Sequence, residues 1–325
     1  MNENILTVFL SLIILIISFI FYKNIKKASL FFNLLDKPDN FRKNQAKAIP
    51  LIGGIYIFFI FCFLFLFIEI FSNFENNLIN LIQFCFCALI FFFGLADDKI
   101  NINANIKIVS VYILFLLYLY LNQRSILNIL EFKELNLSVN IMSVGIFFTA
   151  LCLLIFLNAS NMFDGIDGQA GGYFLFLITY IHYINGFNLF LFLFSISIFI
   201  HLIFNMLQKW YLGDSGVYLV SFFISMLIID TYHFQKLSVE QIFLLMMVPG
   251  LDLIRLFFER LKKGRHPFSP DTRHIHHLLS KKFDKKITLI LNLSIIIIPN
   301  ILAFYFQTYL YFILITFMIY SFLII

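Results

Sequence analysis

The chain has 325 residues, of which 61% are hydrophobic and only 13% are charged, and its formal net charge is +5. An average soluble domain is about 45–50% apolar and about 25% charged, so 23 basic and 18 acidic side chains are too few to cover a soluble protein of this length. This composition excludes a secreted domain, a cytosolic enzyme and a disordered chain, and it predicts an integral membrane protein.

Eleven apolar stretches are candidates for membrane-spanning helices, each of which needs roughly 20 apolar residues. The sixth stretch is short and the ninth is interrupted by Pro249-Gly250, so ten spans is the alternative count. The sequence therefore predicts an all-α polytopic membrane bundle that forms a single domain over residues 1–325. In chain order the stretches cover residues 5–22, 49–71, 78–96, 106–122, 140–157, 170–184, 188–206, 215–230, 239–258, 287–305 and 308–325.

The distribution of lysine and arginine predicts the orientation, because these residues are in excess in cytoplasmic loops. The first stretch is longer than the apolar region of about 7–15 residues in a signal peptide, so it is expected to stay as a helix. With the N-terminus outside and the C-terminus in the cytoplasm, all of the 23 basic residues except Arg124, Lys133 and Lys236 fall on the cytoplasmic side. The positive charge therefore follows membrane topology, and no nucleic acid is expected as a partner.

On this orientation the unusual polar clusters all fall on the cytoplasmic side, which predicts one site. The first cluster is the adjacent pair Asp97 and Asp98 at the end of the third stretch. Two carboxylates at the mouth of an apolar helix repel each other, and a divalent cation or a proton-transfer role would explain them. A solvated helix end is the alternative.

Four oxygen-bearing side chains, Asn158, Asn161, Asp164 and Asp167, recur every three residues. A helical or 3₁₀ turn would place them on nearly one face. Oxygen donors suit a hard cation such as Mg²⁺, which is usually shared with substrate phosphates. The alternative is a capped loop between two helices, with Asn and Asp as turn formers.

Two glycine-containing segments lie at the start of predicted spans. Asp214, in the segment Tyr211–Gly216, would lie at a helix N-terminus, where a carboxylate caps free N–H groups. Capping alone would explain an aspartate at this position. A functional role is considered because the other acidic clusters fall on the same membrane face. The segment Pro50–Gly54 would either start a helix or let the backbone approach a lipid or a phosphate.

The last polar loop contains Arg273, His274, His276 and His277. Three histidines at i, i+2 and i+3 cannot all face one side of a helix, and no cysteine or HExxH spacing accompanies them, so a zinc site is only one alternative. The neighbouring arginines favour an anion-binding loop for a charged, sugar-bearing substrate. A plain basic cytoplasmic loop is the third alternative.

The ninth stretch carries two charged residues, Asp252 and Arg255, three positions apart. We expect them to pair inside the bundle. A helix broken at Pro249-Gly250 would instead open a groove for a lipid tail, and the sequence leaves both alternatives open.

Six motifs in this order resemble the polyprenyl-phosphate N-acetylhexosamine-1-phosphate transferases, and although each is weak alone, together they are specific. The last motif resembles the bacterial branch that uses GlcNAc-1-phosphate more than the muramoyl-pentapeptide branch. Asn44-Gln45 departs from the histidine that this branch often carries, and Asp39-Asn40 holds one extra residue. The motifs are Asp36-Lys37-Pro38 with Phe41-Arg42-Lys43, Pro50–Gly54, Asp97-Asp98, Asn158–Gly168, Gly213–Gly216 and Pro267–His277.

The resemblance implies an enzyme of the bacterial cytoplasmic (inner) membrane with its active site on the cytoplasmic face. It would move a sugar-1-phosphate from a UDP-sugar to undecaprenyl phosphate, release UMP and prime a surface polysaccharide. The implied cofactor is Mg²⁺, with Mn²⁺ as the alternative. The implied site residues are Asp214 and Asn161 for the metal; Asp97, Asp98, Asp164 and Asp167 for catalysis; and Lys107, Asn158, Arg273, His274, His276 and His277 for the substrate.

Several alternatives stay open at this point. The donor could carry another N-acetylhexosamine or the muramoyl-pentapeptide, and a homodimer is an alternative to a monomer. The lipid phosphate could attack directly, or the reaction could pass through an aspartyl-phosphate. An ion-coupled transporter would be a different class, and it predicts acidic residues near the bilayer midplane and internal repeats.

Overall fold

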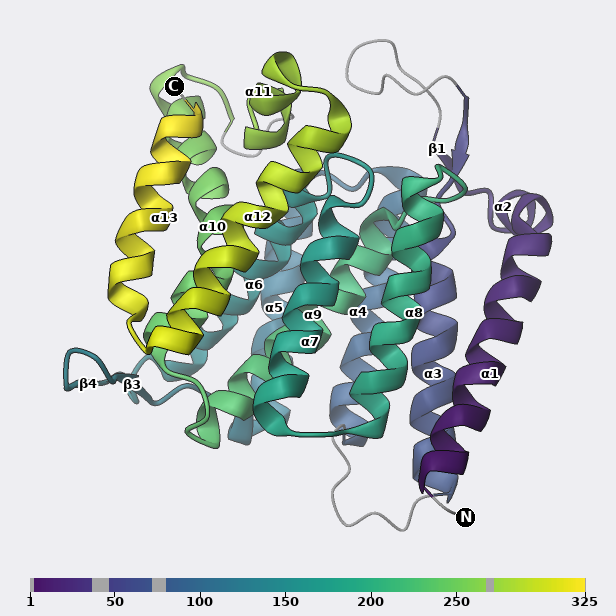
Figure 1. Ribbon diagram of the computed structural model, residues 1–325, viewed down its shortest axis with the longest axis horizontal. Coiled ribbons are helices and arrows are strands. Elements are labelled where there is room, and N and C mark those ends of the chain that lie inside the picture. The colour runs from purple at the N-terminus through teal and green to yellow at the C-terminus, as the bar shows by residue number, and fades with distance from the viewer. Residues whose placement is uncertain (1–2, 37–46, 72–79, 267–271, 325) are drawn as a thin grey trace. The chain divides into compact units, whose positions relative to one another are not determined.

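The computed structural model describes residues 3–36, 47–71, 80–266 and 272–324 (Figure 1). Helices dominate these residues, with one 3₁₀ turn and two short antiparallel strand pairs among them. The elements are α1 (Glu3–Lys23), α2 (Ile25–Phe32), β1 (Leu35–Asp36), β2 (Ile49–Pro50), α3 (Gly53–Phe71), α4 (Leu81–Ile100), α5 (Ala104–Leu121), η1 (Gln123–Ser125), β3 (Ile129–Phe132), β4 (Leu137–Asn140), α6 (Gly145–Phe163), α7 (Gln169–Asn185), α8 (Leu189–Met206), α9 (Gly213–His233), α10 (Val239–Lys262), α11 (Ile275–Lys282), α12 (Lys285–Phe306) and α13 (Tyr309–Ile324).

Each of the eleven predicted stretches contains a helix, which confirms an all-α polytopic membrane protein. Eight of the helices in the described residues are long and apolar enough to cross a membrane, and two shorter ones, Gly53–Ile68 and Tyr309–Ile324, are also apolar. Most helix ends lie within a few residues of the prediction. The exception is the stretch at 140–157, where Asn140 still belongs to β4 and the helix runs from Gly145 to Phe163.

The interruption predicted at Pro249-Gly250 is wrong, because α10 continues through both residues. Proline lacks the N–H for one helical hydrogen bond, and membrane helices tolerate it where neighbouring helices supply polar groups. Pro249 leaves the carbonyl of Leu245 without its helical donor, and Asn300 on α12 donates from Nδ2 to the adjacent carbonyl of Leu244 at 3.4 Å. The groove that a broken helix would open is therefore absent from α10.

The chain forms two compact units, each built from two separate segments. Unit 1 comprises residues 1–102 and 171–223, and unit 2 comprises residues 103–170 and 224–325. The prediction of a single functional domain stays a prediction. In unit 1, α3 packs against α8 and α4, and α1 packs against α3 and α8. Its core is rich in phenylalanine, with Phe61 in contact with the rings of Phe194 and Phe223.

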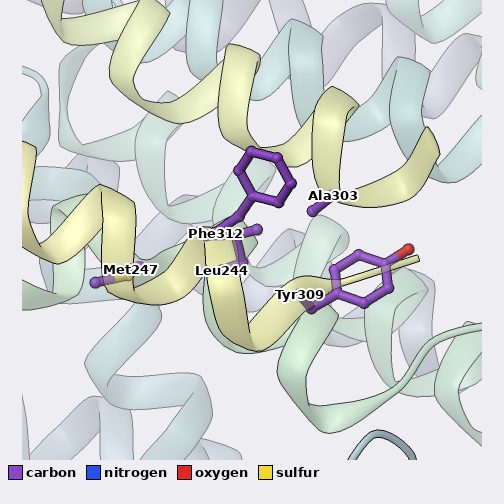
Figure 2. Packing of buried hydrophobic residues seen from close by; sticks show 5 residues of the cluster. All are labelled: Leu244, Met247, Ala303, Tyr309 and Phe312. Atoms are coloured by element: carbon purple, nitrogen blue, oxygen red, sulfur yellow. The ribbon is translucent and has the colours of Figure 1, made fainter. Parts of the chain in front are cut away.

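In unit 2, α10, α12 and α13 pack side by side, and α11 contacts α12 and α13 (Figure 1). Figure 2 shows five buried hydrophobic residues where these three long helices meet: Leu244, Met247, Ala303, Tyr309 and Phe312. The turn between β3 and β4 fastens α13, because the Glu134 carboxylate accepts hydrogen bonds from the N–H groups of Tyr309 and Leu310. This packing holds the C-terminal half of α10 and the first turn of α11 together.

Candidate active site

In unit 1, the end of α4 meets the start of α9 through Asp98. Its Oδ1 accepts a hydrogen bond from the N–H of Asp214 at 2.7 Å, and its Oδ2 accepts one from the N–H of Ser215 at 3.0 Å. The carboxylate of α4 therefore caps α9, whereas the sequence predicted capping by Asp214 itself. Because Asp98 satisfies these two N–H groups, the Asp214 carboxylate is not needed for them, and it lies half-buried beside Asp98.

The two adjacent carboxylates of α4 have different surroundings. Asp97 is 4% exposed, and its Oδ1 accepts a hydrogen bond from the N–H of Ile102 at 2.9 Å. It thereby fixes the turn that follows α4. Asp98 is half-buried, so one acid of the pair is internal and the other is partly exposed.

Glycine backbones bring α3, α4 and α9 into close approach within unit 1. A Cβ at Gly54 would lie 2.5 Å from the N atom of Gly216, and one at Gly94 would lie 2.7 Å from the Cα of Ser215. The N–H groups of Gly53 and Gly54 donate to the carbonyls of Tyr211 and Leu212, both at 2.9 Å. Pro50–Gly54 thus approaches the protein's own backbone around α9, and the sequence could not identify this partner.

A buried His–Trp pair, which no sequence motif indicated, lies behind this contact. The Trp210 indole N–H donates to Nδ1 of His201 at 3.0 Å, and the two residues are 0% and 1% exposed. A Cβ at Gly53 would lie 2.6 Å from Cε1 of His201. The pair therefore supports the segment that carries the glycines.

Replacing Trp210 with phenylalanine is expected to lower the free energy of unfolding by about 1–3 kcal/mol, because a buried imidazole nitrogen loses its donor. Thermal unfolding in detergent, monitored by circular dichroism, would measure this change. Tryptophan fluorescence is not suitable, because the variant lacks the sole tryptophan of the chain. Tyr305→Phe is the matched control, because Tyr305 is 78% exposed. An unfolding temperature equal to that of the control would contradict the role of this hydrogen bond.

In unit 2, the prediction that four evenly spaced polar side chains share one helical face is only partly right. Asn158 and Asn161 lie on α6, but that helix ends at Phe163. Asp164 is the C-cap with a non-helical ψ of 58°, and Asp167 lies in the turn before α7. The periodic spacing therefore continues past the end of the helix, and the two acids project from a loop.

The polar side chains on and near this loop are partly buried. The Asn158 amide donates to the carbonyl of Leu154 on its own helix at 2.8 Å. Asn161, Asp164 and Asp167 are half-buried. Lys107 lies in the first turn of α5 and is also half-buried. These residues all belong to unit 2, whereas Asp97, Asp98 and Asp214 belong to unit 1.

The three histidines lie together, and this agrees with the prediction that they cannot all face one side of a helix, because only His276 and His277 lie on α11. His274 is the N-cap of α11 with non-helical backbone angles, so its ring is not restricted to a helical direction. Its ring is parallel to that of His276 at a centroid distance of 5.5 Å. The ring of His277 lies 4.3 Å from that of His276.

The ring of His276 packs directly against the loop between α6 and α7. A Cβ at Gly165 would lie 1.9 Å from its Nε2, so only glycine leaves room for the ring. His276 is 2% exposed, and burial lowers the pKa of its imidazole to about 3. The ring is therefore neutral at pH 7. This contact joins two motifs that are distant in the sequence.

Asp252 is the centre of a buried polar network, and the predicted pairing with Arg255 is confirmed at 2.8 Å. Its other oxygen lies 2.7 Å from Nδ1 of His274. Glu259 accepts hydrogen bonds from both Arg255, at 2.7 Å, and Arg273, at 2.9 Å. The network ties α10 to the residues that begin α11.

Within the described ranges, no group of three His, Cys, Asp or Glu side chains is arranged to hold a metal ion. The histidine cluster therefore does not have the arrangement of a zinc site. Asp36 lies in β1, whereas the rest of the first motif from Lys37 to Lys43, the departure at Asn44-Gln45 and the segment Pro267–Asp271 lie outside the described residues.

Comparison with known proteins adds the family context. The family described as glycosyl transferase family 4 matches residues 80–232. Three similar proteins carry the name undecaprenyl-phosphate alpha-N-acetylglucosaminyl 1-phosphate transferase. They come from Escherichia coli K12 (27% identity, 86% of this chain and 78% of the relative), Yersinia pestis (29%, 86% and 78%) and Thermotoga maritima (27%, 83% and 80%).

Proposed function

Residues 80–232 match glycosyl transferase family 4, and from that match we propose that the chain transfers N-acetylglucosamine-1-phosphate from UDP-GlcNAc to undecaprenyl phosphate and releases UMP. The observation that carries the proposal is the similarity to relatives named for the transfer of this sugar phosphate, over 83–86% of this chain. The protein is a multi-pass membrane enzyme that acts on a polyprenyl phosphate. The priming of a surface polysaccharide follows from the proposed product.

The donor set supports a Mg²⁺ ion shared with the substrate. Mg²⁺ is usually bound by one or two carboxylates together with substrate phosphates and water. Asp214 offers such a carboxylate, since it is half-buried and its own backbone N–H donates to the neighbouring Asp98. We assign Asp214 as the metal ligand, with Asn161 as the second. When bound, the ion neutralises charge on the donor diphosphate.

The side chains of this protein then carry out binding and proton control. Both reactants are anions, so Lys107, Arg273 and the histidines His274 and His277 oppose their repulsion by binding phosphate oxygens. His276 contributes by packing on Gly165. Asp98 keeps the lipid phosphate deprotonated, and that phosphate attacks the β-phosphorus of the donor directly. Asn158, Asp97, Asp164 and Asp167 complete the proposed site.

A site that brings a lipid substrate and a soluble substrate together is expected at the cytoplasmic ends of the helices. The polyprenyl tail of the acceptor stays in lipid while its phosphate lies at the interface, and the nucleotide sugar comes from the cytoplasm. The excess of basic residues on one side supports this orientation, with the C-terminus in the cytoplasm.

The purified protein is expected to release UMP from UDP-GlcNAc only when both undecaprenyl phosphate and Mg²⁺ are present. EDTA should lower the rate at least about tenfold, because electrostatic stabilisation of the leaving group is lost, and added Mg²⁺ or Mn²⁺ should restore it. A panel of UDP-sugars, including UDP-MurNAc-pentapeptide, tests the donor. Release with only another sugar would change the assigned donor, and no release with any donor would refute the proposed function and favour a transporter.

A further inference from the structure

The carboxylate of Asp252 uses both of its oxygens on different partners. Oδ1 accepts hydrogen bonds from the N–H of Ile275 at 3.1 Å and the hydroxyl of Tyr320 at 3.1 Å, besides the ion pair with Arg255. Oδ2 lies 2.7 Å from Nδ1 of His274. Asp252 is 4% exposed, so these contacts form inside unit 2.

The contact with His274 determines which ring nitrogen carries a proton. An ionised carboxylate can only accept hydrogen bonds, so Nδ1 of His274 must donate. Nε2 is then the nitrogen that remains for another partner. This is the way in which a carboxylate fixes the tautomer and the orientation of a functional histidine.

The same network fixes the backbone on which His274 lies. Arg255 donates from Nη2 to the carbonyl of Arg273 at 2.7 Å, and Asp252 accepts from the N–H of Ile275. The residues on both sides of His274 are thus held from α10. His276, in contrast, has no hydrogen-bond partner for Nδ1 among the residues that the structure describes, and it packs on Gly165.

We propose that Asp252 is a positioning residue that holds His274 in the Nδ1–H tautomer, so that Nε2 is presented to a phosphate or sugar oxygen of the nucleotide sugar. The inference rests on the proposed function for the identity of that ligand. The tautomer itself is a property of the protein without substrate, and it can be measured independently of any activity.

The Asp252→Asn variant tests this proposal, because the donors around Oδ1 determine which way the new amide group faces. Three donors converge on Oδ1, so the amide oxygen of asparagine takes that position and its NH₂ group faces Nδ1 of His274. Nδ1 must then accept, and the neutral ring carries its proton on Nε2. The substitution replaces one oxygen with an NH₂ group but inverts the tautomer.

The first measurement is the imidazole ¹⁵N spectrum of histidine-labelled protein in detergent, with His274 assigned by its loss in His274→Gln. We expect a protonated Nδ1 in the wild type and a protonated Nε2 in Asp252→Asn. A wild-type His274 with Nε2 protonated and Nδ1 bare would overturn the proposal. If Asp252→Asn does not fold, the wild-type spectrum still decides between these two results.

The second measurement is kcat/KM for UMP release, which should fall by about 10–100-fold in Asp252→Asn, as is usual when the partner that orients a functional residue is lost. Glu240→Gln is the matched control, because Glu240 is a second buried carboxylate on α10, 2% exposed, that bonds the N–H of Glu134 at 3.0 Å. Equal activity in both variants would overturn the proposal. An inactive wild type would refute the proposed function alone, because the spectrum would still report the tautomer.

Discussion

Replacing Gly165 with alanine is expected to lower the free energy of unfolding by about 3 kcal/mol and to remove most transferase activity. The new Cβ would lie 1.9 Å from Nε2 and 2.1 Å from Cε1 of His276, well inside van der Waals contact. The His276 ring is buried against His274 and His277, so overpacking must displace α11 or the loop after α6. Thermal unfolding in detergent and UMP release would measure the two effects.

Gly250→Ala is the control for this prediction, because a Cβ at Gly250 meets nothing within 4 Å and the residue lies inside α10. It should be neutral or slightly stabilising, since alanine favours a helix interior over glycine by up to about 1 kcal/mol. The double variant Gly165→Ala/His276→Ala should recover part of the lost stability. Equal unfolding temperatures for Gly165→Ala and Gly250→Ala would show that the ring does not occupy this position.

The second large effect is expected at Asp98, where one carboxylate both caps α9 and lies beside Asp214. Asp98→Ala should reduce UMP release by about 100-fold or more, because the proposed proton acceptor is lost. It should also cost about 1–2 kcal/mol of stability, since the N–H groups of Asp214 and Ser215 lose their acceptor. Asp98→Asn should be as inactive but less destabilised, because its amide oxygen can still accept one of the two hydrogen bonds.

Asp284→Asn separates capping from chemistry. Asp284 is the N-cap of α12 and accepts a hydrogen bond from the N–H of Ile287 at 2.8 Å, so it does for α12 what Asp98 does for α9. Its replacement is expected to leave kcat/KM unchanged. Activity retained in Asp98→Asn would remove Asp98 from the chemistry and leave it as a cap alone.

The helices of this protein follow from the sequence by itself. Long apolar runs must satisfy their backbone hydrogen bonds internally in a bilayer, and a helix does this within one segment. The property is local, so each of the eleven stretches could be located without knowledge of its neighbours. The pairing of Asp252 with Arg255 is equally local, since residues three apart are neighbours on a helix.

Residue spacing did not predict side-chain positions correctly where a motif extends past the end of a helix. The spacing of Asn158, Asn161, Asp164 and Asp167 indicated one face, but α6 ends at Phe163 and the two acids lie in the loop. The histidines, in turn, can lie together because His274 is outside α11 as its cap. In both cases the end of a helix, which spacing does not locate, decided where the side chains lie.

The sequence by itself determined the membrane class, the positions of the helices and the motifs that resemble a family. Tertiary structure alone decided what the motif residues touch. Asp98 meets the N–H groups of Asp214 and Ser215 at a separation of 116 and 117 residues, and Gly165 meets the ring of His276 across a comparable distance in the chain. Apolar patterns and helix periods record only interactions within a few residues. Contacts across such separations depend on which helix faces pack together, and that is decided by the fold as a whole.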